Sequence, residues 1–387
     1  MTDLTYVTAG ESHGKGILAL IEGLPAGLEI DFTSVNETLA MRQKGYGRGG
    51  RQKIESDRAE ALSGMKGGRT LGTPLALWVA NRDAKLETLP RVRAPRPGHA
   101  DLAGCLKTGS KDARDILERS SARETAGRTA AGAVAAQLIG TLGVNVFAHV
   151  TSLGEAKSPR TPVKQVTPAL IETREGSPVR CLDDASSREM MRAVDRAGEG
   201  GDSLGGVVEA VAVGAVPGVG GFDRWENRLD ARIAAAMMGI PAVKGVEIGL
   251  GFSASEKPGR DVHDEIHFNP ALVADGKPHG FFRASNRAGG LEGGMTNGEA
   301  VVVRVALKPI PTLKKPLKTV DLDTGRGMEA AAERSDVCAV PSAAIIVEAV
   351  LAFEMARAYR EKFGGDSTDE MQRNYRAYVE SLRGFIP

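Results

Sequence analysis

Two histidines lie in segments that hold too much glycine and proline to form the interior of a strand or helix. His13 stands in the loop GESHG at residues 10–14, and His99 ends the segment APRPGH at residues 94–99. An imidazole in a loop can meet a ligand and exchange a proton near neutral pH, although many loop histidines do neither. Asp101 is close enough in sequence to orient His99 or to cap a helix, and the pattern fits both roles.

Arginines are concentrated in glycine- and proline-rich segments, where several guanidinium groups can surround one anion. Glycines alternate with basic residues in MRQKGYGRGGR at residues 41–51. A mobile solvated loop could have the same composition, but so many guanidinium groups favour recognition of a phosphate or carboxylate. The arginines that we expect to bind an anionic substrate are Arg42, Arg48, Arg51, Arg96 and Arg123.

The stretch LERSSARETAGRTAAGAVAAQLIGTLG at residues 117–143 predicts one long helix with an anion site at its start. Ser121 and Glu124 have the spacing of a capping box, in which each side chain binds a backbone N–H group of the first turn. Basic side chains at that end oppose the helix dipole unless an anion is bound there. An alanine-rich helix with unrelated arginines is the plain alternative. The basic residues at this end are Arg119, Arg123 and Arg128.

The body of this predicted helix carries small side chains on every face, from Ala130 to Ala136. A helix at the surface would have a charged side. We therefore expect it to be buried between other elements and to stop at Gly143.

Apolar runs between glycine-rich turns predict the elements that position these groups. Strands are expected at 4–8, 17–22, 53–62, 75–80, 207–213 and 300–307, and helices at 31–44, 227–238 and 342–356. The glycine-rich turns that each precede a strand are 64–72, 198–206 and 289–298. This repetition suggests a duplicated unit of sheet and helix.

The composition restricts the class of protein. The 387 residues have a net charge of +1, with 42% hydrophobic and 4% aromatic residues, which indicates neither disorder nor bulk attraction to nucleic acid. Three widely spaced cysteines and the lack of an H-E-x-x-H motif argue against a disulfide framework and a metal site. With no targeting segment and no membrane-length apolar run, a cytoplasmic protein is expected.

Six blocks of sequence resemble the chorismate synthase family. They occur in the family's order, span most of the chain, and include no generic nucleotide signature. The blocks are GESHGKGILALIEGLPAG (10–27), RPGHAD (96–101), ERSSARETAGRTAAGAV (118–134), GGLEGGMTNG (289–298), KPIPT (308–312) and ERSDVCAVPSAAIIVEAV (333–350).

The resemblance implies an α+β fold, a β-α-β sandwich with long helices between two antiparallel sheets, and a homotetramer. We expect a single domain over 1–387, with a surface excursion at 159–178 and a peripheral tail at 364–387. The implied enzyme is a carbon–oxygen lyase that eliminates phosphate from 5-enolpyruvylshikimate 3-phosphate to give chorismate, the last step of the shikimate pathway. Reduced FMN is required without net redox change, and NADPH is used only if the enzyme reduces its own flavin.

The resemblance also assigns roles to residues. His13 is expected beside the departing phosphate, His99 at the N1 side of the flavin, and Asp336 as the acid that assists at N5, although Asp336 could instead cap the helix that follows. The arginines named above become the contacts to substrate or NADP. The implied flavin contacts are Arg119, Ser120, Ser121, Pro241, Ala242, Gly293, Lys308, Pro309, Ile310, Pro311, Thr312 and Arg334.

Two other functions would keep the arginines. One is an enzyme of phosphate esters that needs no flavin, and the other is a non-catalytic protein that binds a regulatory anion. Neither accounts for two histidines and an acid in rigid loops, so acid–base chemistry on an anionic small molecule is the preferred interpretation.

Overall fold

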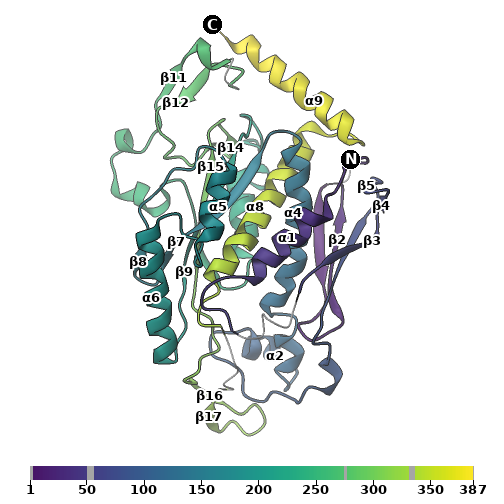
Figure 1. Ribbon diagram of the computed structural model, residues 1–387, viewed down its shortest axis with the longest axis vertical. Helices are drawn as coiled ribbons and strands as arrows, with labels where there is room; N and C mark the ends of the chain where they lie inside the picture. The colour runs from purple at the N-terminus through teal and green to yellow at the C-terminus, as the bar shows by residue number, and fades with distance from the viewer. Residues whose placement is uncertain (1–2, 50–55, 274–276, 331–335, 387) are drawn as a thin grey trace.

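The computed structural model describes residues 3–49, 56–273, 277–330 and 336–386 (Figure 1). Arg51 and Arg334, two of the predicted site residues, lie outside these ranges. Within the described part of the chain, no helix is both long and apolar enough to cross a membrane. All three cysteines are free and buried.

A four-stranded antiparallel sheet is built from the N-terminal part of the chain. Its order is β1 (Thr5–Ala9), β2 (Gly16–Glu22), β6 (Leu75–Ala80) and β3 (Ala59–Ser63). Alternate side chains of β2 and β6 are buried, so this sheet turns one apolar face toward the core.

A five-stranded antiparallel sheet forms the other side of the core. Its order is β10 (Val243–Ile248), β15 (Val301–Leu307), β9 (Gly206–Val213), β7 (Asn145–Leu153) and β8 (Ala156–Lys157). Five of the six predicted strands are confirmed, each to within one residue at either end. For the sixth, 53–62, the structure has β3 at Ala59–Ser63, and residues 53–55 lie outside the described ranges. Two strands of the suggested duplication, β9 and β15, are neighbours in this sheet, and the third, β6, belongs to the other one.

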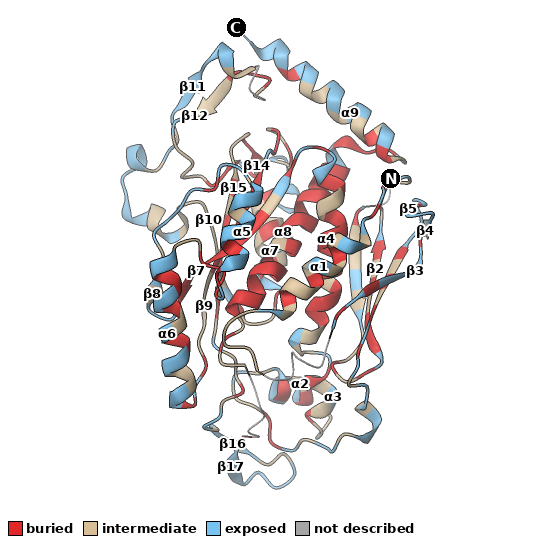
Figure 2. Ribbon diagram, in the orientation of Figure 1, coloured by how far each residue is buried: buried red, intermediate tan, exposed pale blue. Residues whose placement is uncertain are grey.

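Three helices pack together and contact strands of the two sheets (Figure 1). Helix α4 (Thr125–Gly140) packs on β2 and β6, α8 (Val340–Phe363) packs on β7 and β9, and α1 (Phe32–Gln43) contacts both helices. Figure 2 shows α4 and α8 as the most continuously buried helices. A Cβ atom on Gly132 would lie 2.2 Å from the carbonyl oxygen of Ala349, so α4 approaches α8 closely only because glycine stands there. The prediction of a buried helix of small residues is confirmed.

The prediction of one long helix over 117–143 is wrong at its start. The chain forms α3 (Arg114–Leu117), a 3-10 turn (Ala122–Glu124), and then α4. The helix is interrupted because the carbonyl of Glu118 accepts a hydrogen bond from the backbone N–H group of Ser12, at 2.9 Å. That carbonyl is therefore bonded to another segment of the chain instead of continuing a helical ladder.

The predicted capping box is also wrong in its detail. Ser121 does cap the 3-10 turn, but its hydroxyl accepts from the N–H group of Arg123. The carboxylate of Glu124 bonds to Thr8 and Arg128 instead of returning to Ser121. Helix α4 ends at Gly140, three residues before the predicted stop, and Gly143 follows it with φ of +81°.

The remaining elements lie around this core. They include the helices α2 (Asp101–Thr108), α5 (Pro168–Gly176), α6 (Asp184–Gly200), α7 (Leu229–Met238) and α9 (Thr368–Ser381), and four small hairpins. These hairpins are β4–β5 (Met65–Lys66, Arg69–Thr70), β11–β12 (Ile266–Phe268, Phe281–Arg283), β13–β14 (Leu291–Glu292, Met295–Thr296) and β16–β17 (Lys318–Val320, Gly327–Glu329). In Figure 1, α2 and β16–β17 lie at the lower end of the molecule and α9 at the upper end.

Candidate active site

The loop that carries His13 joins β1 to β2 and is held by one amide side chain. Asn81, directly after β6, donates through Nδ2 to the carbonyl oxygens of Glu11, Ser12 and Gly14, at 3.0, 3.2 and 2.8 Å. Asn81 is buried, and its own Oδ1 accepts from Arg123 Nε at 2.7 Å. The histidine loop is thus joined to one of the predicted anion-binding arginines.

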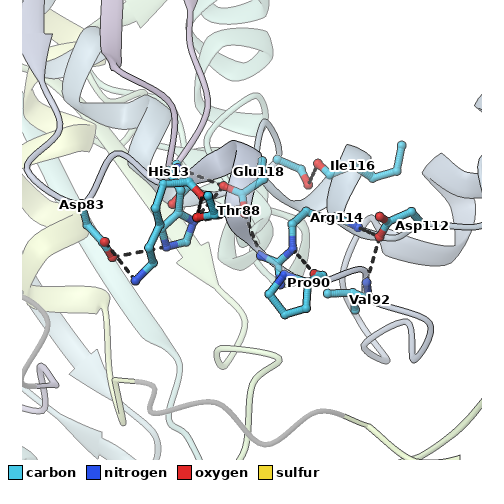
Figure 3. A network of polar contacts seen from close by, with 12 residues as sticks. His13, Asp83, Thr88, Pro90, Val92, Asp112, Arg114, Ile116 and Glu118 are labelled. Carbon is cyan, nitrogen blue, oxygen red and sulfur yellow. Dashed lines mark hydrogen bonds and ion pairs between the residues drawn. The ribbon is translucent and has the colours of Figure 1, made fainter.

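The ring of His13 faces a buried carboxylate, that of Glu118 (Figure 3). Nδ1 of His13 lies 3.0 and 2.9 Å from the two carboxylate oxygens of Glu118, and Arg114 Nη1 donates to the same carboxylate at 2.9 Å. Burial alone would raise the pKa of Glu118, but the hydrogen bonds from His13 and Arg114 outweigh burial and lower it. On the other side of the ring, Asp83 lies 3.7 Å from Nε2.

Arg42 and Arg123 share one buried aspartate, Asp57. Arg42 Nη2 donates to one oxygen of Asp57 at 2.5 Å, and Arg123 Nη1 donates to the other at 2.6 Å. Asp57 is only 3% exposed, so both cations lie at the edge of the protein interior. Two guanidinium groups against one carboxylate leave one positive charge without a partner among these three side chains.

Arg48 forms an ion pair with Asp336, the predicted catalytic acid. Arg48 Nη1 lies 2.9 Å from Asp336 Oδ2, and the backbone N–H group of Gly49 donates to the other oxygen at 2.6 Å. Burial lowers the pKa of the Arg48 guanidinium, although the charge of Asp336 opposes this. Arg48 and Asp336 lie near the start of α8. Their neighbours Gly47 and Val337 are joined there, since the backbone N–H group of Val337 donates to the carbonyl of Gly47 at 2.7 Å.

His99 is held by two residues of its own segment. Its Nδ1 contacts Asp101 Oδ1, and Arg96 donates to Asp101 Oδ2 from Nε at 2.9 Å and from its backbone N–H group at 3.0 Å. Asp101 is fully buried, which opposes its ionisation, but the hydrogen bonds from His99 and Arg96 hold its pKa well below the usual range. Asp101 therefore takes the first of the two roles that the sequence left open, since it orients His99 and makes no side-chain cap of α2.

A cleft of about 550 Å³ brings six of the predicted residues together. They are His99, Arg119, Ser120, Pro241, Ala242 and Lys308. The cleft also holds Arg128 and Lys244, so four basic side chains line it. Ala242 has φ of +72°, in the left-handed region that few residues other than glycine adopt, and such backbone geometry is concentrated at functional sites.

The KPIPT segment forms one wall of this cleft through Lys308. Lys308 Nζ donates to the carbonyl of Gly98, and its backbone N–H group donates to the carbonyl of Ala242 at 2.9 Å. The segment then turns away, and Ser203 donates to the carbonyl of Ile310 at 2.6 Å. Lys308 therefore connects the His99 loop to the entry of β10.

Other predicted residues lie near the cleft or apart from it. Ser121 directly follows Ser120, and Pro309 to Thr312 follow Lys308. Gly293 lies in the turn between β13 and β14, where Met295 of the same hairpin is its near neighbour, and it does not line the cleft. Four residues of these networks were missed by sequence reasoning: Asp57, Asn81, Glu118 and Lys244. Arg128, one of the basic residues of the predicted anion site, does line the cleft.

The larger cavity of the described structure lies elsewhere. It measures about 1070 Å³ and is lined by the outer face of the five-stranded sheet, by 160–167 and by 277–287. None of the predicted site residues lines it. The larger cavity also holds a histidine, a serine and basic side chains, but we assign the chemistry to the smaller cleft, because six of the predicted site residues line it.

Comparison with known proteins identifies the family of the chain. A family model described as chorismate synthase matches residues 4–359. The chorismate synthase of Symbiobacterium thermophilum is 50% identical over 98% of this chain and 99% of its own length, and that of Desulforudis audaxviator is 51% identical over 98% of each. A crystal structure of chorismate synthase superposes with a TM-score of 0.80 at 39% identity, over the full length of both chains. The chain belongs to the chorismate synthase family.

Proposed function

We propose that this chain eliminates phosphate from 5-enolpyruvylshikimate 3-phosphate by anti-1,4-elimination, giving chorismate. It would act as a carbon–oxygen lyase at the last step of the shikimate pathway. The observation that carries the proposal is the turn at residues 118–120: Glu118 holds His13, and the next two residues, Arg119 and Ser120, line the cleft that contains His99. Two proton-exchanging rings are thereby held on two sides of one short turn.

The charge of the arginine network suits a substrate with one phosphate and two carboxylates. Asp57 compensates only one of the two charges of Arg42 and Arg123. The Nε atoms of Arg42 and Arg48 are buried and have no hydrogen-bond partner among the described residues. A guanidinium N–H group without a hydrogen-bond partner can bind an oxygen of an anion.

We assign a different proton-transfer role to each of His13, Asp336 and His99. His13, beside the arginine network, would stabilise the negative charge that develops on the departing phosphate. The proton that leaves the substrate needs an acceptor, and the carboxylate of Asp336, which is paired with Arg48, would assist in taking it up. His99 would hold a proton at its own side of the cleft, and Asp101 would keep the His99 ring in a fixed orientation.

The residues of the cleft fit a flavin mononucleotide. Arg119, Arg128, Lys244 and Lys308 supply positive charge for its phosphate, with Ser120 as a hydroxyl donor. When bound, reduced FMN would supply electron density to the substrate transiently, without net redox change. Reduction of the flavin by NADPH is not part of the elimination, so NADPH matters only if this chain reduces its own flavin.

We also propose the finer architecture and the setting that the resemblance implies. Contacts of α4 with one sheet and of α8 with the other support a β-α-β sandwich, and the three glycine-turn units support an internal duplication. The domain would be single, with 159–178 as an excursion and 364–387 as a tail. A homotetramer is testable by light scattering, and three free buried cysteines suit the reducing cytoplasm.

The decisive experiment is an anaerobic assay with chemically reduced FMN and the phosphorylated substrate. We expect release of equal amounts of phosphate and chorismate, and no turnover when FMN is omitted. Phosphate release without flavin would identify the phosphate-ester enzyme instead. Substrate binding without turnover in any arm would identify the anion-binding regulator. A parallel arm with NADPH and oxidised FMN tells whether the chain reduces its own flavin.

The substrate placement is tested with Arg48→Ala. A charge-assisted hydrogen bond contributes about 1.5–3 kcal/mol, so substrate affinity should fall by about ten- to a hundredfold. Arg69→Ala is the matched control, because Arg69 forms an exposed ion pair with Glu29 on the surface. Parental affinity in Arg48→Ala would remove this residue from the substrate site.

The flavin placement is tested with the double variant Ser121→Ala and Arg334→Ala, compared with Lys66→Ala, which changes an exposed residue of β4. FMN affinity in the presence of substrate should fall in the double variant and remain parental in the control. An unchanged affinity in the double variant would contradict the placement.

A further inference from the structure

We propose that Glu118 is a positioning residue that keeps a proton on Nδ1 of His13, so that Nε2 becomes the ring nitrogen that exchanges a proton with the substrate. The kinetic part of this inference rests on the proposed function, and the part that concerns the proton on His13 does not. Three features of the structure carry it.

First, Glu118 holds both the ring and the backbone of His13. Its Oε2 lies 2.9 Å from Nδ1 and accepts the backbone N–H group of the same histidine at 2.9 Å. The carbonyl of Glu118 accepts from Ser12, and the carbonyl of His13 accepts from Leu86 at 3.0 Å. A ring flip that exchanged Nδ1 for another ring atom would lose the contact with the carboxylate, so one edge of the imidazole stays with Glu118.

Second, the carboxylate of Glu118 is kept as an acceptor. It is 3% exposed and receives Arg114 Nη1 at 2.9 Å, while Arg114 Nε is fixed to the carbonyl of Pro90 at 2.7 Å (Figure 3). The pKa of Glu118 is lowered by the hydrogen bonds from His13 and Arg114 against the opposing effect of burial. An ionised carboxylate has no proton to donate, so the hydrogen bond to it requires a proton on Nδ1.

Third, the opposite ring nitrogen is turned toward the more open side. Nε2 lies 3.7 Å from Asp83, whose side chain is 30% exposed, whereas the side chain of Glu118 is 3% exposed. Access to His13 from outside is therefore by way of Nε2. With Nδ1 committed to Glu118, Nε2 alone gains or loses a proton during the reaction.

A purely structural anchor is the rival role for Glu118, and Glu118→Gln separates the two. Glutamine has the same shape and keeps an oxygen that can accept the backbone N–H group of His13. Its NH₂ group can also donate to Nδ1, which removes the requirement for a proton there. Asp115→Asn is the matched control, because Asp115 lies on the same short helix α3 and bonds to Ser110, at 2.6 Å, instead of His13.

The direct measurement is the ¹⁵N spectrum of histidine-labelled protein, recorded above the pH range in which imidazoles titrate. The six histidines are distinguished by comparison with His13→Gln. We expect His13 of the parent and of Asp115→Asn to carry its proton on Nδ1, and we expect Glu118→Gln to shift the proton to Nε2. A parent spectrum with the proton on Nε2 overturns the proposal without any variant, and so does an unchanged spectrum in Glu118→Gln.

Steady-state kinetics test the consequence for catalysis. In Glu118→Gln, kcat should fall by about a hundredfold or more, as expected when a carboxylate that sets a histidine tautomer becomes an amide. KM should change by less than about threefold, because the variant removes an interaction with the catalytic ring and none with the substrate. A shifted proton with parental kcat overturns the role in turnover.

The two hypotheses fail in different ways. If the parent protein does not turn over the phosphorylated substrate, the proposed function fails, and the spectrum still decides the role of Glu118. If Glu118→Gln does not fold, Glu118→Asp replaces it: aspartate is still an acceptor, so the proton must remain on Nδ1, and its appearance on Nε2 would overturn the proposal.

Discussion

His13 and His99 are held by the same two kinds of group, a carboxylate and a guanidinium, which come from very different distances along the chain. In both sites Nδ1 of the ring contacts a buried carboxylate, and an arginine binds that carboxylate from another side. At His99 the carboxylate of Asp101 is two residues away. At His13 the carboxylate of Glu118 is 105 residues away, so this site exists only after β1, β2 and α3 have docked.

The surroundings of the two rings differ in charge as well. Arg96 Nη2 lies 3.1 Å from Nδ1 of His99, so a cation touches that ring directly. At His13 the arginine bonds to Glu118, and Asp83 stands at the opposite nitrogen. One framework of imidazole, carboxylate and guanidinium thus provides two electrostatic environments, which suits two different proton roles in one reaction.

The largest effects should come from removing the rings. His13→Ala and His99→Ala should each slow turnover by about a hundred- to ten-thousandfold, the usual contribution of a general acid or base. Because both rings are proposed to serve one transition state, the double variant should lose less than the product of the two single losses. Anaerobic assays with saturating reduced FMN measure these losses. Near-parental turnover in either single variant would show that its ring takes no part in the reaction.

A smaller effect is expected from Asp101→Asn. It leaves Arg96 without its buried counter-charge, and the loss of charge-assisted hydrogen bonds should lower the free energy of unfolding by about 2–3 kcal/mol. Urea denaturation at neutral pH measures the change. Glu29→Gln, at an exposed ion pair, is the control and should change stability little. If both variants are equally stable, the buried site near His99 contributes nothing to the fold.

The two carboxylates also predict how stability depends on pH. Asp101 and Glu118 have folded-state pKa values below the ordinary values of 3.8 and 4.5. A lowered carboxyl pKa gives stability that is complete above the ordinary value and is lost as the pH falls through the folded-state value. The parent should therefore lose stability as the pH falls below about 4.5, and Asp101→Asn should lose less over the same interval. Parallel curves for the two proteins would contradict the assignment to Asp101.

The smallest effect is expected from Asp83→Asn, which tests the second carboxylate near His13. Asp83 is 30% exposed and lies 3.7 Å from the ring, so the interaction should contribute at most about 1 kcal/mol, and turnover should fall less than about fivefold. A loss as large as that in Glu118→Gln would mean that both nitrogens of His13 need a carboxylate partner.

The same contrast explains how much could be predicted from the sequence. Asp101 was a candidate partner of His99 because the two are neighbours in a rigid loop. Glu118 and Asp57 gave no local signal, because their partners come from segments far along the chain. Periodicity predicted the strands and the buried helix, but not the break before α4, which depends on a hydrogen bond to the distant Ser12.

The central place of α8 has a consequence for the synthesis of the protein. This helix spans residues 340–363 and packs against α4, α1 and two strands of the five-stranded sheet, all of which precede it. Until the ribosome has released it, the apolar faces that it covers have no partner within the chain. The earlier segments must therefore wait in an incomplete, aggregation-prone state, because contacts of such long sequence separation form late. A ribosome that stalls before residue 340 would leave a nascent chain that depends on chaperones.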